Sequence, residues 1–435
     1  MFLRYVILRL LTVVPTLLAI ILLIFAFKAF IPDDFLERTL TESVTQQAGL
    51  SQEDLVKEIL ELRKDLQLDL PLFYFTIQSS ILPDTLHKIY PIEKADFIRD
   101  ILLEYGNREN AENYVLQVFE LQRSGNFEAR VLGNQLFGIT SPEAIAGFLG
   151  PIQNTPIVES FKAMNKFKST VSPLVPAFKW IGPSNQFHQW LSGLLSLDFG
   201  KSIVDQREVS IKIKTALINT LHITIPGLLG VLLICIPIGI WLSRLKGILR
   251  RVSTTILFAL DALPLFWISL LLILFLASNQ FINAFPAFGL TTVNADGLSL
   301  QYLVLPVLAL IISAVGYVSM QVAKAINDEE SKVYVLSARA LGYSEKDVLW
   351  RHVFRNSLIP IITIISGFFI SAFAGSLVVE IIFSIPGMGK LLYDSVSMRD
   401  FPVILGVLLV ISTIKIIVNL LTDVSYKVIN PTVNF

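Results

Sequence analysis

The chain has 435 residues, of which 53% are hydrophobic and 16% are charged, and its mean hydropathy is +0.65. Soluble domains carry about a quarter charged residues, so this composition excludes an ordinary soluble protein and indicates that much of the chain lies in lipid. Basic and acidic residues number 35 each, so the overall charge gives no indication of nucleic-acid binding. The single cysteine, Cys235, lies in an apolar run, which excludes an intrachain disulfide and a cysteine-based zinc cluster.

Six stretches are apolar and long enough to cross a bilayer, which takes about 20 residues. They are Val6–Phe30, Leu217–Leu242, Thr254–Ala277, Tyr302–Val322, Ile359–Phe383 and Val403–Val424. The first has the basic start of a signal peptide, since Arg4 and Arg9 precede an apolar stretch. Its core is too long, and no small-residue cleavage site follows before Lys28 and Phe30. Residues 1–30 are therefore predicted to be an uncleaved transmembrane anchor.

Basic residues are distributed unequally among the loops between these spans. The loops after the second and fourth spans are rich in them: Arg244, Lys246, Arg250, Arg251, and then Lys324, Lys332, Arg339, Lys346, Arg351, Arg355. The loop 278–300 has none, and the loop after the fifth span has only Lys390 and Arg399. Because basic loops stay on the cytoplasmic side, both termini are predicted to be cytoplasmic, with Ile31 to Lys214 outside.

The predicted extracytoplasmic segment, residues 31–212, is too long for a plain connection and too amphipathic to be disordered. Apolar residues recur every three or four positions in Glu93–Tyr105, Arg108–Arg123 and Ile157–Phe167, which is typical of helices. Ser141 followed by Pro142 has the pattern of a helix N-cap with proline in the first turn. These signals predict a small α-helical domain inserted at about residues 81–184.

Gly200-Lys201-Ser202, just before the second span, is the one soluble motif that suggests nucleotide binding. A phosphate-binding P-loop would need glycine at position 195, which is Leu195. No predicted strand precedes the motif, and the topology puts it outside, away from ATP. A turn is therefore the favoured interpretation.

No catalytic or metal-binding constellation emerges from the sequence. The four histidines, His87, His188, His222 and His352, lack the H-E-x-x-H spacing, and no G-x-S-x-G elbow occurs. No catalytic residue and no metal ligand is predicted.

Two charges fall inside apolar spans, Asp261 in the third and Lys415 in the last. Ionisable residues in the membrane are costly and usually face a cavity or each other. Counting at helical rise places both at about 10–12 Å from the same face, so an ion pair between them is one hypothesis. The alternative is that Lys415 snorkels toward the interface and Asp261 forms a local hydrogen bond.

A polar, basic run from Tyr334 to Pro360 joins the fourth and fifth spans. Residues 334–341 are expected to form a short amphipathic helix that ends at Gly342, since glycine suits the left-handed position after a helix. Ser344-Glu345-Lys346-Asp347 has the pattern of a capping box that starts the next helix. Small Ala338 and Ala340 allow close approach by another surface. Spacing alone favours an ordinary helix-turn-helix connection between two spans.

This run resembles the EAA loop of permeases from binding-protein-dependent ABC importers of dipeptides, oligopeptides and nickel. The matching positions are Tyr334, Ala338, Arg339, Ala340, Gly342, Ser344, Glu345, Val348, Arg351, His352, Arg355, Asn356, Leu358, Ile359 and Pro360. Other landmarks also resemble that family. They are Arg9-Leu10-Leu11 with Pro15-Thr16-Leu17, residues 197–202, Pro264–Trp267, Glu380 through Gly389, Arg399–Pro402 and Asn419–Asp423.

The resemblance covers about residues 1–73 and 186–430. The chain departs from the family between about residues 81 and 184, where relatives have only a brief link. It also has Leu341 in place of the usual lysine, Ser337 in place of threonine and Leu197 in place of a glycine.

The resemblance implies an all-α type I ABC importer permease with six transmembrane helices, here with an inserted α-helical extracytoplasmic domain. The family's short loop helix docks in a groove on an ATPase subunit, so the implied coupling residues are Ser337, Ala338, Arg339, Ala340, Leu341 and Gly342, with Arg339 as the charged contact. The family's outer-mouth element corresponds to Glu380, Pro386, Gly387 and Gly389, although a loop that merely connects is an equal alternative. A short returning helix is expected at Lys390–Ser397.

The implied organisation has a five-helix core at residues 213–428, a cytoplasmic coupling loop at 334–360 and a cytoplasmic tail at 429–435. The chain would bind no cofactor and hydrolyse no ATP, because ATP and magnesium would bind two partner ATPase subunits. A second homologous permease, a solute-binding protein and membrane lipid complete the implied partners, in a bacterial inner or plasma membrane.

The resemblance implies di- or oligopeptides as the substrate. The alternatives are nickel or another small solute within the family, or a polytopic receptor or assembly factor of another class.

Overall fold

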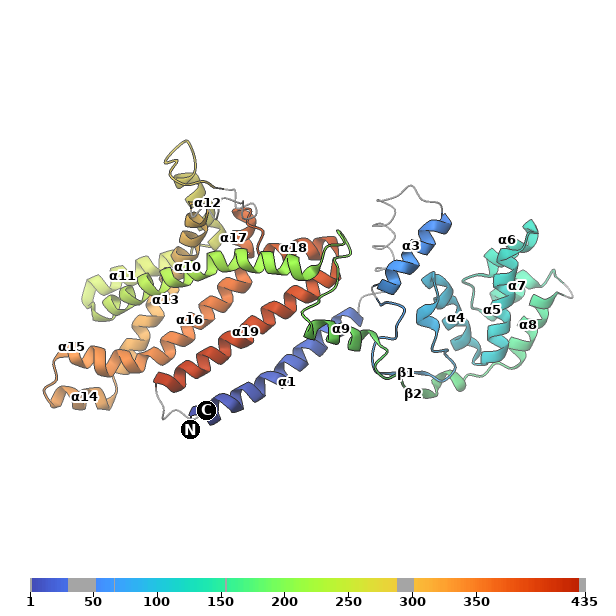
Figure 1. Ribbon diagram of the computed structural model, residues 1–435, viewed down its shortest axis with the longest axis horizontal. Helices are drawn as coiled ribbons and strands as arrows, with labels where there is room; N and C mark the ends of the chain where they lie inside the picture. The colour runs from blue at the N-terminus through green and yellow to red at the C-terminus, as the bar shows by residue number, and fades with distance from the viewer. Residues whose placement is uncertain (1, 30–51, 66, 153–154, 288–300, 430–435) are drawn as a thin grey trace. The chain divides into compact units, whose positions relative to one another are not determined.

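The computed structural model describes residues 2–29, 52–65, 67–152, 155–287 and 301–429, which are mostly helical (Figure 1). The chain forms two compact units. The membrane unit comprises Met1–Ala26 and Phe199–Phe435, and the insert unit comprises Phe27–Asp198. Of the predicted tail, residues 430–435 lie outside the described part of the chain.

Among the described residues, five helices of the membrane unit are long and apolar enough to cross a bilayer, and a bent pair of helices gives a sixth span if it crosses as one. Four of the five match predicted spans: α1 Phe2–Ala29, α10 Val209–Arg244, α13 Gln301–Glu330 and α19 Phe401–Ile429. The last three extend beyond the predicted bounds at both ends, whereas α1 begins before Val6 and is described as far as Ala29. The fifth is continuous from the predicted capping box into the membrane, through α15 Glu345–Asp347, a π-helical stretch Val348–Phe354 and α16 Arg355–Gly375. The long loop between α13 and α16 therefore contains helix almost throughout.

The predicted third span, Thr254–Ala277, is not one continuous helix. Two helices, α11 Gly247–Asp261 and α12 Leu265–Leu276, meet there at 92°. The break falls at Pro264, which has no N–H to donate and disfavours helical backbone at the residue before it. At twelve residues α12 is about 18 Å long, shorter than the ~30 Å hydrocarbon core.

The predicted end of the fifth span is also wrong. The helix stops at Gly375, and α17 Leu377–Ile382 is a separate short helix after a break at Ser376. A loop then leads to α18 Met388–Met398, which agrees with the returning helix expected at Lys390–Ser397 but begins two residues earlier.

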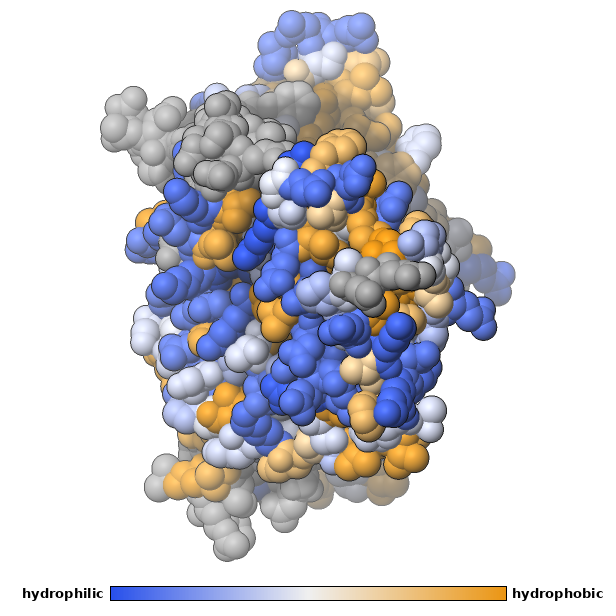
Figure 2. Space-filling model, turned by 90° about the vertical axis from the view of Figure 1, so that its right-hand side faces the viewer, coloured by the Kyte–Doolittle hydropathy of each residue, from blue (hydrophilic) through white to orange (hydrophobic). Residues whose placement is uncertain are grey.

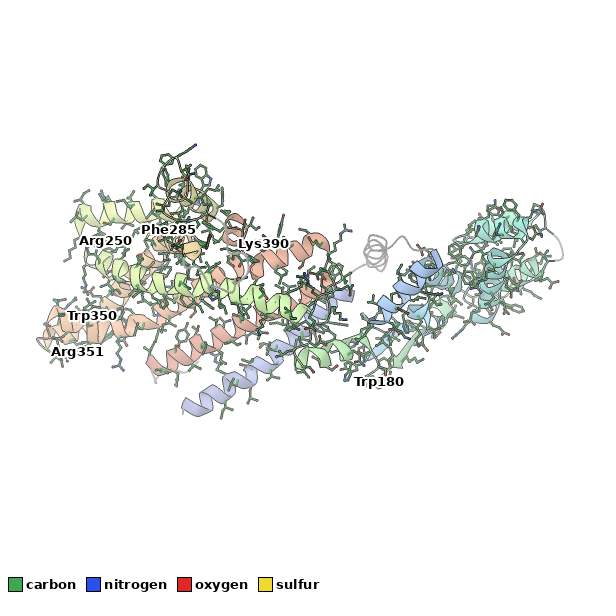
Figure 3. All side chains as sticks on the ribbon, turned by 45° about the horizontal axis from the view of Figure 1, so that its top comes forward. Trp180, Arg250, Phe285, Trp350, Arg351 and Lys390 are labelled. Atoms are coloured by element: carbon green, nitrogen blue, oxygen red, sulfur yellow. The ribbon has the colours of Figure 1, made fainter. Side chains whose placement is uncertain are left out.

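Small residues let the spans of the membrane unit pack closely. A Cβ on Gly239 of α10 would overlap Val322 of α13, and one on Gly316 of α13 would overlap the α11 backbone at Leu257 and Asp261. Such close backbone approach is typical of helix pairs in membranes. Figure 3 shows Arg250, Trp350 and Arg351 at the same end of this unit, so the two basic loops share one face.

The insert unit has its own helical core. Its helices are α3 Gln52–Asp65, α4 Ile92–Tyr105, α5 Arg108–Arg123, α6 Phe127–Leu136, α7 Pro142–Leu149, α8 Pro156–Lys166 and α9 Gln186–Leu195. Three of them agree with the periodic segments to within one residue. Ser141 caps α7 as predicted by accepting a hydrogen bond from the Ala144 N–H at 3.2 Å.

Two short strands of the insert unit were not predicted. β1 Phe75–Ser79 and β2 Pro176–Trp180 pair antiparallel, with Phe75 opposite Trp180 and Ile77 opposite Phe178. These four apolar side chains share one face of the ribbon, because alternate strand residues point the same way, and all four are exposed. Elsewhere the surface seen from this side of the molecule is largely hydrophilic, with separate hydrophobic patches (Figure 2).

Candidate functional site

The predicted coupling helix is present as α14, Val333–Ala340. Gly342 follows it with φ +85°, and its N–H donates to the Arg339 carbonyl at 3.0 Å. That backbone conformation is costly for any residue with a side chain, so glycine is the natural residue here. Ser344 then caps α15 by accepting from the Asp347 N–H at 3.2 Å. Both local predictions are confirmed.

One face of α14 is buried in the membrane unit and the other is exposed. Val335 and Ala338 are 0% and 5% exposed and pack in the core formed with α10, α13 and α16. The surface that approaches the small Ala338 closely is this chain's own core, whereas Ala340 is exposed. Val333, Leu336 and Leu341 are 77%, 56% and 78% exposed. Together these three residues form an apolar surface, here called the docking face.

Arg339 is engaged within the chain. Its guanidinium donates to Glu345 at 2.9 and 3.1 Å and also contacts Glu330 at the end of α13. Glu330 in turn accepts from Arg244 at the end of α10. The hydrogen bonds that Arg339 donates to Glu345 and Glu330 raise the pKa of Arg339, and the bond that Glu345 accepts lowers the pKa of Glu345. Arg339 thus ties α14 to α10, α13 and α15, whereas sequence reasoning had assigned it to a partner.

Tyr334 holds the start of α14 against its neighbours. Its hydroxyl donates to Glu329 at 2.6 Å and accepts from the Asn356 amide at 2.9 Å. Burial and then the bond to Glu329 raise the pKa of Tyr334 to about 12. Together with the Arg339 contacts, this network fixes α14 at both ends.

The predicted outer element is assembled around a buried carboxylate. Glu380 of α17 is 0% exposed and accepts hydrogen bonds from Thr220 at 2.7 Å, Ser376 at 2.6 Å and the Lys390 N–H at 2.8 Å. Lys390 lies in the first turn of α18, where free N–H groups and the helix dipole favour a negative charge. Glu380 therefore joins α17, α10 and the start of α18.

The other predicted residues of this element surround the same carboxylate. The Pro386 carbonyl accepts from Asn219 of α10 at 2.9 Å. A Cβ on Gly387 would overlap the Glu380 carboxylate, and one on Gly389 would overlap the Leu377 backbone. The structure thus brings Glu380, Pro386, Gly387 and Gly389 together in one packed cluster.

Sequence reasoning missed the α10 side of this cluster. Thr220 both donates to Glu380 and accepts from the Met388 N–H at 2.8 Å. Asn219 and Thr220 form a polar pair inside an apolar span, and such residues usually have a specific partner. That polar pair was the available signal.

A second outer cluster joins two motifs that were singled out separately. Asp400, 2% exposed, accepts from the Ser202 hydroxyl at 2.5 Å and from the Ile203 N–H at 3.1 Å. The Gly200-Lys201-Ser202 motif leads directly into a turn at residues 203–205, with Lys201 bridged to Glu208, and Ser202 fastens this segment before α10 to Asp400 before α19. This agrees with the turn that was favoured over a P-loop.

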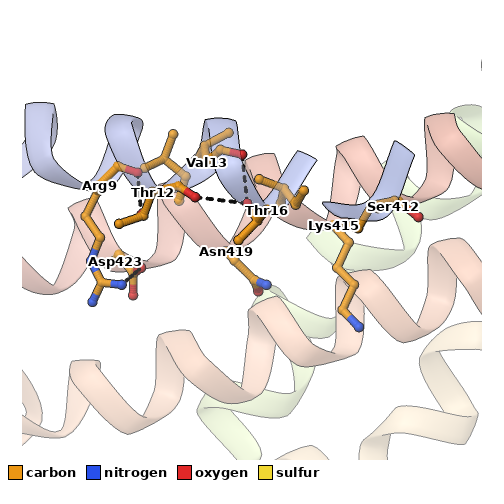
Figure 4. Close-up of a pocket in the computed structure, with 11 residues that line it drawn as sticks. Arg9, Thr12, Val13, Thr16, Ser412, Lys415, Asn419 and Asp423 are labelled. Atoms are coloured by element: carbon orange, nitrogen blue, oxygen red, sulfur yellow. Dashed lines mark hydrogen bonds and ion pairs between the residues drawn. The ribbon is translucent and has the colours of Figure 1, made fainter. Parts of the chain in front are cut away.

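The hypothesis of an Asp261–Lys415 ion pair is wrong. No contact joins them: Asp261 ends α11 beside Gly316, whereas Lys415 lines a groove between α19 and α1 (Figure 4). Both side chains are exposed, and within the described residues neither has an ion-pair partner. Counting residues gave their depths along each helix but not their positions around the bundle.

Comparison with known proteins defines the class. Residues 235–435 match the family described as the inner membrane component of binding-protein-dependent transport systems. The chain belongs to this family of ABC transporter permeases, since permeases that are a third identical to it align over more than two thirds of their own length.

Several curated relatives agree with this assignment. The chain is 34% identical over 260 residues to the inner membrane ABC transporter permease protein YejB of Escherichia coli O157:H7, covering 58% of this chain and 71% of the relative. It is 33% identical to the oligopeptide transport system permease protein AppB of Bacillus subtilis, covering 58% and 80%. It is 35% identical to the glutathione transport system permease protein GsiC of Salmonella choleraesuis, covering 58% and 79%. This chain is therefore a multi-pass permease of the bacterial inner membrane.

Proposed function

We propose that this permease forms half of the translocation pathway of an ATP-driven importer of di- or oligopeptides. A second related permease would supply the other half, two ATP-binding subunits the energy, and a solute-binding protein the substrate. The names of the relatives, which include oligopeptide and glutathione transport systems, support the substrate class. The observation that carries the proposal is the docking face of α14, an exposed apolar surface in the basic loop between α13 and α16.

The contacts of α14 explain how an ATPase could move the spans. Its buried face packs on α10, α13 and α16, and Arg339 links it to the ends of α10 and α13 through Glu330 and Arg244. The helix after Gly342 runs without interruption into the membrane as α15, the π-helical stretch and α16. A displacement of α14 by closing ATPases would therefore pass directly to three spans.

The distribution of basic residues supports a cytoplasmic position for α14. Arg250 and Arg351, from the two basic loops, lie at the same end of the membrane unit (Figure 3). Basic loops remain on the cytoplasmic side, so this end, both termini and the docking face would meet the ATPases there. ATP and magnesium would bind those partner subunits.

The Glu380 cluster is the proposed outer gate element. Glu380 contacts Thr220 in the first half of α10, Val209–Arg244. The coupling loop lies near the other end of this helix, where Arg244 pairs with Glu330. The cluster would couple α17 and α18 to α10, so that a movement of α10 carries the outer loop with it.

The insert unit is proposed to contact the solute-binding protein, which would face the same compartment. Its ribbon exposes Ile77, Phe178 and Trp180 at 66%, 66% and 65%. Apolar patches on otherwise polar surfaces often mark protein contacts. Deletion of residues 82–184 should abolish the stimulation of ATPase activity by the receptor, and an unaffected rate would exclude this role.

Purification of the tagged chain from its native membranes tests the proposed function. We expect recovery of ATP-binding subunits and a second permease, with vanadate-sensitive ATPase activity that the peptide-loaded solute-binding protein stimulates. Recovery of the chain without any ATP-binding subunit would contradict the proposal. Stimulation by nickel rather than peptide would redirect the substrate class.

A further inference from the structure

A groove of about 400 Å³ lies between α1 and α19, within the membrane unit (Figure 4). Its lining is mostly apolar by area, but it includes polar side chains from both helices: Arg9, Thr12 and Thr16 from α1, and Ser412, Lys415, Asn419 and Asp423 from α19. Arg9 and Asp423 form an ion pair at 3.2 Å at one end. A row of polar residues between two spans is costly in lipid unless something polar covers it.

Lys415 is the residue that most needs a partner. It lies 14 residues from each end of α19, Phe401–Ile429, or about 21 Å along the helix in either direction. A lysine near a helix end can snorkel to the headgroups, but one at the centre is farthest from both. Its side chain is exposed and has no hydrogen-bond or ion-pair partner among the residues the structure describes.

Asn419, one turn away on the same face, adds a second donor. Its side chain also has no hydrogen-bond partner in the described chain, and it is exposed in the groove. By contrast, the Thr12 and Thr16 hydroxyls donate to their own helix, to the Arg9 and Val13 carbonyls at 2.7 Å each. The groove thus presents an ammonium and an amide together, a combination that favours a carboxylate.

We propose that this groove receives a membrane-spanning helix of the second permease, which brings an aspartate or glutamate to Lys415. This inference rests on the proposed function, since it takes the second permease as a partner. The acid must come from within the bilayer, because a lipid phosphate stays at the interface. A passing substrate would leave the ammonium bare between transport cycles, whereas a partner helix remains in place.

Replacement of Lys415 by methionine tests the proposal. Removing a charge from the centre of a span favours insertion, so any loss of association would not reflect failure to enter the membrane. We expect Lys415→Met to lower the recovery of the second permease by roughly tenfold, while Lys415→Arg retains most of it. Lys324→Met is the matched control, because Lys324 is exposed six residues from the end of α13 and can reach the interface.

A charge exchange identifies the partner residue. Lys415→Glu should block assembly, and lysine in place of one particular aspartate or glutamate in the spans of the second permease should restore it. Unchanged recovery with Lys415→Met would overturn the inference, as would intact assembly with only a raised KM for peptide, which would assign Lys415 to the substrate. If the unaltered chain recovers no second permease at all, the proposed function fails instead.

Discussion

The two ends of the membrane unit, the coupling-loop end proposed to be inner and the Glu380 end proposed to be outer, differ in whether charges are buried and apolar side chains exposed. At the inner end, Arg339 and Glu345 pair at the surface and the docking face remains uncovered. At the outer end, Glu380 is completely buried and three donors from three elements satisfy it. The inner end is therefore complete as a fold but leaves an apolar surface to be covered, whereas the outer end closes on itself.

The helix breaks at the two ends also differ: one is an open turn and the other is packed in the core. At Gly342 the break produces a tight turn, and a Cβ added there would meet open space. At Gly387 the break is packed against Glu380, so a Cβ has no room. Substitutions at the inner end should therefore affect partners and coupling, and those at the outer end should affect the stability of the permease itself.

The largest expected effect comes from a charge in the docking face. Leu336→Asp should lower association with the ATP-binding subunits by more than about tenfold, because docking would bury an unpaired carboxylate. Co-purification measures it, and thermal unfolding of the permease alone should not change. Leu341→Lys is the control, since lysine is usual at that position in the family that the loop resembles. If Leu336→Asp associated normally with the ATP-binding subunits, the docking face would not be their binding surface.

An effect on stability, and not on association, is expected at the outer end. Glu380→Ala leaves Thr220, Ser376 and the Lys390 N–H without their acceptor and should lower the free energy of unfolding by about 3 kcal/mol. The melting temperature in detergent measures this change, and association with the ATP-binding subunits should persist. If Glu380→Ala instead melted normally and lost its ATPase partners, the division of roles would be reversed. Thr220→Val removes one of the three donors, so its melting temperature should lie between those of the unaltered chain and Glu380→Ala.

Replacement of Gly342 should separate ATP hydrolysis from transport. Gly342→Val places a β-branched residue at φ +85°, a strain of roughly 1–2 kcal/mol that would shift α14 relative to α15. We expect reduced peptide uptake with ATPase activity largely retained, measured in proteoliposomes. Gly342→Asn is the matched control, because asparagine tolerates the left-handed region. Unchanged uptake by Gly342→Val would contradict a role for this turn in coupling.

The smallest effect concerns the titration of Tyr334. Its pKa is raised to about 12, so its contribution to stability is complete below the ordinary value near 10 and is lost as the pH rises from about 10 to 12. The difference in tyrosinate absorbance between the unaltered chain and Tyr334→Phe should therefore appear only near pH 12. A midpoint near 10 would show that the bond to Glu329 does not hold α14.

Local signals in the sequence predicted local structure well. The helices α4, α5 and α8 agree with the predicted ranges to within one residue, and the turn at Gly342 and the cap at Ser344 formed as expected. Periodicity, glycine and capping residues act over a few positions, so a single sequence contains them. Pro264 was an equally local signal, but the apolar residues on both sides of it favoured a continuous span.

What the sequence did not reveal depends on contacts between distant segments. β1 pairs with β2 about 100 positions later, and Glu380 meets Thr220 160 positions earlier. Similarly, helical spacing gave α14 two faces but could not say that Ala338 packs inward or that Glu330 binds Arg339. The residues of the candidate site could therefore be predicted from the sequence. Which residues pair with its charged side chains could be seen only in the structure.

Photo-crosslinking from the docking face tests the central claim most directly. A photoreactive amino acid in place of Leu336, irradiated in whole cells, should form an adduct with an ATP-binding subunit, while the same residue in place of the buried Val335 should not. An adduct with an extracytoplasmic protein, or none at all with any ATP-binding subunit, would contradict the account.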